Sequence, residues 1–116
     1  NPHELEIFGD GSQMRDFAYV TDVARALITA AVRAEAHGEA YNVASGATHS
    51  IAQLAQAICE LSGAAPRLKY TGQVRPGDAE KWEVDVRRLQ ALGFEPQTTW
   101  RDGLAAIQEW YLGLGQ

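Results

Sequence analysis

Two arginines stand where they could bind a phosphate group. Arg15 follows a Gly-rich loop at residues 9–11 and leads into a strand that alternates charged and apolar residues. A guanidinium group forms two parallel hydrogen bonds with a phosphate, so Arg15 in a cleft would suit a phosphorylated ligand. The alternative is a surface ion pair with the neighbouring Asp16, worth under about 1 kcal/mol. Gly-rich loops are common, so residue types and spacing alone favour the ion pair slightly.

The second arginine belongs to the turn Arg75-Pro76-Gly77-Asp78. Proline fixes one backbone dihedral and keeps Arg75 out of the helical region, and glycine adopts a positive φ where one is needed. Such a turn can place a cation and a carboxylate on the same side. This would suit a nucleotide, with the arginine on the diphosphate and the aspartate on ribose hydroxyls. The alternative, slightly favoured by residue types alone, is a solvent-exposed turn in which Arg75 and Asp78 pair with each other.

Asn42 is a third candidate, because it lies inside an expected strand at 40–44, where asparagine is disfavoured. Its amide should therefore have a specific hydrogen-bond partner. The sequence leaves a backbone group and a ligand equally open. For Trp82 the sequence suggests no role beyond that of a core or interface anchor.

Residues for catalysis and metal binding are not evident in the sequence. The histidines are far apart and have no second ligand at metal spacing, so we expect no metal site. Cys59 lies among helix residues without a nearby base, which favours a structural thiol. No Tyr-x-x-x-Lys, G-x-S-x-G or G-x-G-x-x-G motif occurs. We therefore expect the chain to bind a ligand without supplying catalytic residues.

Apolar residues at helical spacing predict four helices that would position these groups. They lie at 23–34, 51–61, 86–92 and 100–111. Each has a candidate N-cap: Thr21 or Asp22 for the first, Ser50 with Gln53 as a capping box for the second, Asp85 for the third, and Thr99 with Asp102 for the fourth. Glycines are expected to end the first three: Gly38, Gly63 and Gly93.

Short strands are predicted between the helices, at 5–8, 16–20, 40–44, 67–71 and 81–84. This order predicts the α/β class, as a small mixed α+β domain. Two features look incomplete: the first helix is narrow and Ala-rich, and the strand at 40–44 is too short to form a sheet with its neighbours. We therefore expect the unit to pack on something larger.

The composition is that of one globular domain. The chain has 116 residues, of which 46% are hydrophobic and 22% charged, and this excludes a disordered protein. A net charge of −5 argues against a nucleic-acid partner. No apolar run reaches the roughly 18 residues of a membrane span, and the first residues lack signal-peptide features. A single cysteine excludes an internal disulfide, so we expect a cytoplasmic protein without membrane contact.

Several segments, taken in order, resemble a known family. They are the run 5–22, the Tyr-Asn-Val-Ala-Ser-Gly segment at 41–46, the helix after Ser50, the Arg-Pro-Gly-Asp turn, and the segment 89–96 before the final helix. Together they resemble the C-terminal, substrate-binding part of NAD-dependent nucleotide-sugar epimerases and dehydratases, the extended short-chain dehydrogenases. The likeness is greatest to UDP-glucose 4-epimerases. It covers nearly the whole chain, and the order of the motifs makes it far more specific than any one of them.

The resemblance implies a set of residues that bind a nucleotide-diphosphate sugar, such as a UDP- or dTDP-sugar: Glu6, Ile7, Phe8, Arg15, Asn42, Arg75 and Asp78. The first three would line the pyrimidine base. The two arginines would bind the diphosphate. Asn42 would contribute to the nucleotide pocket, and Asp78 would hold ribose hydroxyls.

The resemblance also implies what these residues lack. In the family, a Rossmann-type cofactor domain with the catalytic tyrosine and lysine lies upstream of the matching segments. Residues 1–116 would then be a C-terminal nucleotide-sugar-binding domain fragment, and its elements at 22–46 normally complete that absent domain. NAD would be the cofactor of the parent enzyme, with none bound by this fragment alone. Without the absent domain the fragment would be inactive, and its uncovered first helix would favour self-association.

Three functions follow from this reading. The first is substrate binding in an NAD-dependent sugar epimerase, UDP-sugar 4-epimerase-like, which oxidises the sugar at C4 and then returns the hydride. The second is the same role in a dTDP-sugar 4,6-dehydratase. The third is a stand-alone, non-catalytic binding or interaction module.

Overall fold

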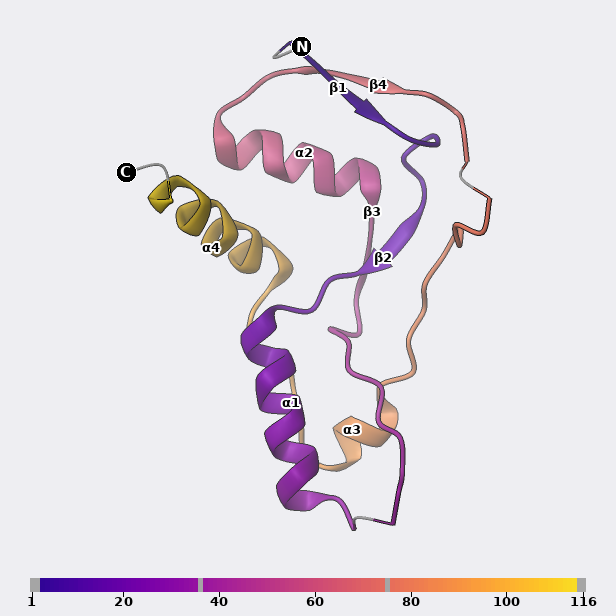
Figure 1. Ribbon diagram of the computed structural model, residues 1–116, viewed down its shortest axis with the longest axis vertical. Helices are drawn as coiled ribbons and strands as arrows, with labels where there is room; N and C mark the ends of the chain where they lie inside the picture. Colours follow the sequence, from indigo (N-terminus) through magenta and orange to yellow (C-terminus); the bar gives the residue numbers. More distant parts are fainter. Residues whose placement is uncertain (1–2, 36, 75, 115–116) are drawn as a thin grey trace.

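The chain folds into a mixture of helices and short strands (Figure 1). The computed structural model describes residues 3–35, 37–74 and 76–114. Over these ranges the elements are β1 (Glu4–Ile7), β2 (Met14–Asp16), α1 (Val20–Arg33), β3 (Thr48–Ser50), α2 (Ile51–Ser62), β4 (Arg67–Tyr70), α3 (Arg87–Ala91) and α4 (Trp100–Gly113). The predicted mixed α/β class is therefore confirmed.

The described strands pair into small sheets that bring distant segments together. β1 pairs in parallel with β4, with Ile7 opposite Tyr70, and β2 pairs antiparallel with β3. A parallel pair needs a long crossover, and here α1 and α2 lie in the chain between β1 and β4. Beyond the strands, the Gly9 N–H donates to the Gln73 carbonyl at 3.0 Å. The loop after β1 is thereby held against the segment after β4.

Several strand predictions are wrong in extent or in kind. The strand predicted at 16–20 is instead β2 at Met14–Asp16, and α1 begins at Val20. The strand predicted at 40–44 is not formed, since a strand requires a hydrogen-bonded neighbour and the described chain places no strand beside this segment. At 81–84 the described residues form only a bridge between Lys81 and Met14.

The second and fourth helices begin at the predicted caps. Ser50 Oγ accepts the Gln53 backbone N–H at 3.1 Å, and the Gln53 side chain accepts the Ser50 N–H at 2.8 Å, which confirms this capping box. Gly63, with φ of +66°, ends α2 as predicted. Thr99 Oγ1 accepts the Asp102 N–H at 3.2 Å. The Asp102 carboxylate bonds the Thr99 hydroxyl instead of its N–H, so this second box is only half formed.

The N-caps predicted for the first and third helices are wrong. α1 begins at Val20 without a side-chain cap, and both Thr21 and Asp22 lie inside it. α3 begins at Arg87, two residues after Asp85. The Asp85 carboxylate still accepts the Arg87 N–H, at 3.0 Å, from outside the helix.

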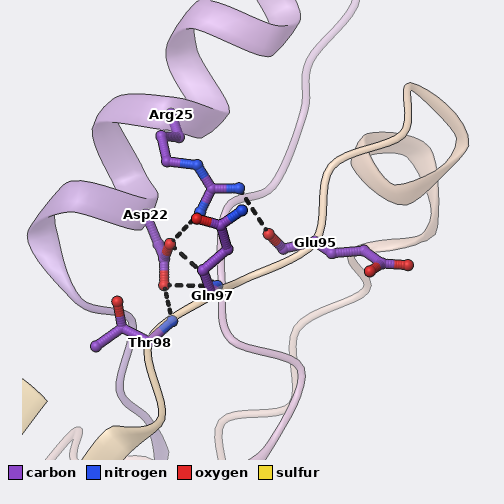
Figure 2. A network of polar contacts seen from close by, with 5 residues as sticks. All are labelled: Asp22, Arg25, Glu95, Gln97 and Thr98. Carbon is purple, nitrogen blue, oxygen red and sulfur yellow. Dashed lines mark hydrogen bonds and ion pairs between the residues drawn. The ribbon is translucent and has the colours of Figure 1, made fainter. Parts of the chain in front are cut away.

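Asp22 joins α1 to the segment before α4 (Figure 2). Its buried carboxylate accepts the backbone N–H of Gln97 at 3.1 Å and that of Thr98 at 2.9 Å. Arg25, one turn further along α1, donates to this carboxylate at 2.5 Å and to the Glu95 carbonyl at 3.1 Å. Burial raises the pKa of Asp22, but the Thr98 and Gln97 N–H groups and the Arg25 charge together bring it below the usual 3.8. Asp22 is therefore an ionised, structural side chain.

The molecule is a thin, open plate. It measures 52 × 39 × 17 Å and has a radius of gyration of 17.1 Å, whereas a compact domain of this length has about 13 Å. Figure 1 shows β2 and β3 between a part formed by β1, β4, α2 and α4 and a part formed by α1 and α3. The buried apolar cluster lies in this second part, with partly buried residues around it: Ala26, Leu89 and Phe94, then Tyr41, Val43 and Leu92.

The open shape leaves one face of α1 exposed. The large apolar side chains on it are Val20, Leu27, Ile28 and Val32. Contiguous exposed apolar surface of this kind is typical of an interface. Across the described residues, none of the helices has both the length and the apolar character needed to cross a bilayer.

Candidate functional site

β1 and the residue that directly follows it, Phe8, carry the groups that the resemblance assigns to a base. Ile7 is buried, whereas Glu6 and Phe8 on either side of it are exposed. Lys69 on β4 lies 3.5 Å from the Glu4 and Glu6 carboxylates. Their charges, Glu4 first, raise the pKa of Lys69 above its usual 10.5. Ion pairs as well as backbone pairing therefore join β1 to β4.

Two glycines bring the loop after β1 close to its neighbours. Gly9 and Gly11 have φ values of +78° and +81°. A Cβ at Gly9 would lie 1.8 Å from Nε2 of Gln13, and one at Gly11 would lie 2.5 Å from the Tyr70 ring, so a side chain at either position would force a shift. Gln13 is buried and donates to the Phe8 carbonyl at 3.3 Å. Its Oε1 has no hydrogen-bond partner in the part of the chain that the structure describes.

Arg15, in the middle of β2, is held by three groups of the chain. Its Nη1 donates to the Met14 carbonyl at 2.8 Å and to the Ala79 carbonyl at 2.7 Å. Its Nη2 forms an ion pair with the Asp78 carboxylate. The guanidinium carbon also lies 5.8 Å from the ring centre of Trp82, within the range of a cation–π contact. Trp82, which had no clear role in the sequence, thus helps to surround Arg15.

Backbone hydrogen bonds keep the segment 78–82 beside Arg15. The Met14 N–H donates to the Glu80 carbonyl at 2.9 Å, and the Trp82 N–H donates to the Met14 carbonyl at 3.1 Å. The partner of Arg15 is therefore fixed by a contact between residues more than sixty positions apart.

Asp16 is not the partner of Arg15. Its carboxylate accepts the backbone N–H groups of Ser45 at 2.7 Å and Gly46 at 2.8 Å. The surface ion pair considered from the sequence is therefore wrong in its partner. Asp16 instead joins β2 to the loop before β3.

A cavity of about 320 Å³ opens beside these groups, at the lower end of the range for ligand sites. Its lining residues come from β1, the loop after it, β2, α2 and the segment after β4: Glu6, Ile7, Phe8, Gln13, Arg15, Ile51 and Asp78. A second depression of about 340 Å³ adjoins it and shares Gln13 and Asp78. Five of the predicted substrate-binding residues thus surround one cavity.

Only one of the other two predicted residues lies in the part of the chain that the structure describes. Asn42 is exposed, donates to the Asp85 carbonyl at 3.2 Å and does not line the cavity. Its partner in the structure is thus a backbone group, one of the two alternatives open from the sequence. Arg75 lies outside the described residues.

Sequence reasoning missed Gln13 and Ile51 as lining residues. Gln13 lies two residues after the Gly-rich loop at 9–11, and a polar side chain so close to this loop is a signal that could have identified it. Ile51 looked like an ordinary apolar residue at the start of a helix, and nothing local distinguished it.

The arrangement is suited to binding. One guanidinium, the two accessible carboxylates of Glu6 and Asp78, and an apolar wall can hold an anion, hydroxyl groups and a flat ring. Within the described ranges, His, Cys, Asp and Glu side chains do not gather in groups of three or more that could hold a metal ion.

Known proteins similar to this chain include sugar-nucleotide dehydratases and epimerases. The model of the NAD dependent epimerase/dehydratase family matches residues 1–44. A dTDP-glucose 4,6-dehydratase of Escherichia coli is 36% identical over 93% of this chain and 32% of its own length. The solved structure of MoeE5 in complex with UDP-glucuronic acid and NAD has 38% identity and a TM-score of 0.85, over 96% of this chain and 37% of that one.

A third comparison is the UDP-glucose 4-epimerase of Thermotoga maritima, solved with UDP-glucose. It is 31% identical, with a TM-score of 0.83, over 99% of this chain and 37% of that one. The chain thus spans about a third of the length of these relatives. It belongs to the NAD-dependent epimerase/dehydratase family and corresponds to one part of such a protein.

Proposed function

We propose that this chain is the C-terminal, nucleotide-sugar-binding part of an NAD-dependent sugar epimerase, UDP-sugar 4-epimerase-like, which acts in the cytoplasm. One observation carries the proposal: Glu6, Ile7, Phe8, Arg15 and Asp78 come from distant segments and line the same cavity. The names of two solved neighbours, which hold UDP-glucuronic acid and UDP-glucose, support the same class of ligand.

Each lining group has a task in this proposal. Arg15 binds the diphosphate, because a guanidinium matches phosphate oxygens in charge and geometry. Asp78 accepts hydrogen bonds from ribose hydroxyls. Glu6, Ile7 and Phe8 line the pyrimidine base. Asn42 and Arg75 keep their predicted nucleotide contacts on the resemblance alone.

The Gly-rich loop of this chain differs from the loop of a dinucleotide site. A dinucleotide site places a Gly-rich turn between a strand and a helix, whose N-terminus then binds the pyrophosphate. Here the Gly-rich loop at 9–11 runs from β1 to β2 and does not lead into a helix. We therefore propose that the chain binds the substrate, and that the NAD site and the catalytic residues lie in the rest of the protein.

The part of the protein that binds NAD would also cover α1. The exposed apolar face of α1 and the unpaired segment at 40–44 are the features that a Rossmann-type domain would complete. Separated from that domain, the chain should self-associate and bind a hydrophobic dye. A monomer that binds no dye, seen by sedimentation and fluorescence, would support the stand-alone module instead.

The test of substrate binding is calorimetric titration of the protein that carries this chain with UDP. Arg15→Ala removes a charged hydrogen-bonding partner and should weaken UDP by roughly 10- to 150-fold. The matched control is Arg101→Ala, since Arg101 pairs with Glu60 at 2.9 Å on the α2–α4 side, away from the cavity. Equal UDP affinity in the wild type and Arg15→Ala would refute the proposal.

A dTDP-sugar 4,6-dehydratase is the second candidate. The 36% identity to the Escherichia coli enzyme of that name favours it. Titration with dTDP beside UDP separates the two, because tighter binding of dTDP would favour the dehydratase.

A further inference from the structure

We propose that Asp78 makes this site prefer nucleoside diphosphates over free pyrophosphate. Its carboxylate pairs with Arg15 and leaves it when a ligand supplies hydroxyl donors to the carboxylate and a phosphate to Arg15. This inference rests on the proposed function and assigns Asp78 a further task as a selectivity residue.

Asp78 is not needed to orient Arg15. Both hydrogens of Nη1 are already taken, by the carbonyls of Met14 and Ala79. The Met14 carbonyl is fixed in turn by the Trp82 N–H at 3.1 Å. The guanidinium would therefore keep its place without Asp78. The effect of the ion pair is to neutralise the charge of Arg15.

The Asp78 carboxylate can leave Arg15 easily. Its side chain is 41% exposed, and Arg15 is the partner that the described residues provide. Asp16 differs, because its two carboxylate oxygens accept the backbone N–H groups of Ser45 and Gly46. Because the described residues donate no backbone N–H to Asp78, its carboxylate loses little when a second anion binds Arg15.

Charge makes this exchange selective. The cavity is lined by the carboxylates of Glu6 and Asp78, with Arg15 as the cation among its described lining residues. A phosphate group on Arg15 would lie close to the released Asp78 carboxylate, and like charges repel. Ribose hydroxyls can donate to that carboxylate and offset the repulsion, whereas pyrophosphate carries no such donors.

The test compares UDP and inorganic pyrophosphate on the protein that carries this chain. Asp78→Asn keeps the shape of the side chain and removes its charge, so pyrophosphate should bind roughly two- to fivefold tighter. UDP should gain less or weaken, so the preference for UDP over pyrophosphate should fall. Unchanged preference in Asp78→Asn would overturn the inference.

The matched control is Asp85→Asn. Asp85 also forms an exposed ion pair with an arginine, Arg87, but it does not line the cavity. This variant should leave both affinities unchanged. A gain in pyrophosphate affinity equal to that of Asp78→Asn would mean that net charge, and not the Arg15 contact, causes the effect. That result would overturn the inference.

Two further variants separate this inference from the proposed function. Asp78→Ala should repeat the gain in pyrophosphate affinity, and circular dichroism establishes that both Asp78 variants are folded. Arg15→Ala should weaken both ligands. If UDP binding does not depend on Arg15, the proposed function fails. If it does, and the two Asp78 variants leave the preference unchanged, only the role of Asp78 fails.

Discussion

Two aspartate–arginine pairs in this molecule show opposite surroundings. Asp22 pairs with Arg25 on α1. The Asp22 side chain is 4% exposed, and its carboxylate also accepts two backbone N–H groups. Asp78 pairs with Arg15 at the cavity, where it is 41% exposed and accepts no backbone N–H from the described residues. Backbone donors and burial, more than the ion pair itself, decide whether an aspartate is structural or exchangeable.

The largest effect should come from Asp22→Ala. Gln97 and Thr98 would lose a charged acceptor for their N–H groups, and each such bond contributes about 1.5–3 kcal/mol, so the free energy of unfolding should fall by about 3 kcal/mol. Urea unfolding of the protein that carries this chain measures the change. A loss below about 1 kcal/mol, the value for an exposed pair, would remove the distinction between the two aspartates.

Acid should act on the same residue. The pKa of Asp22 in the folded protein lies below the usual 3.8. The stability that this carboxylate contributes is therefore present above pH 3.8 and is lost as the pH falls through the folded pKa. Urea midpoints at a series of pH values should fall more steeply on acidification in the wild type than in Asp22→Asn. Parallel curves for the two proteins would contradict the assignment.

The smallest effect on stability should come from Asp78→Ala. The pair with Arg15 is half exposed on the Asp78 side, so its loss should change the free energy of unfolding by less than about 1 kcal/mol. Because salt screens exposed charges, 1 M NaCl should shrink this small difference but leave the Asp22→Ala difference largely intact. A salt-insensitive loss of several kcal/mol at Asp78 would make it a structural residue like Asp22.

Local interactions were predictable from the sequence, and distant ones were not. The capping box of Ser50 and Gln53 involves residues three positions apart, so residue types alone identified it. Residue types make Thr21 or Asp22 a candidate helix cap, whereas the actual partners of Asp22, Gln97 and Thr98, lie about 75 positions away. The strand at 40–44 failed for a related reason, since pairing depends on a neighbour that no local pattern reveals.

The candidate site divides in the same way. The resemblance assigned Glu6, Arg15 and Asp78 to one ligand, and the structure places them around one cavity. Residue types suggest Asp16 as a partner of Arg15. The structure instead pairs Arg15 with Asp78, through a contact that depends on how the segment 78–82 docks on β2.

The most direct test is a crystal structure, with bound UDP, of the protein that carries this chain. We expect a phosphate oxygen within hydrogen-bond distance of Arg15, and the Asp78 carboxylate moved from Arg15 to a ribose hydroxyl. UDP bound elsewhere, with Arg15 and Asp78 still paired, would contradict the proposed binding site.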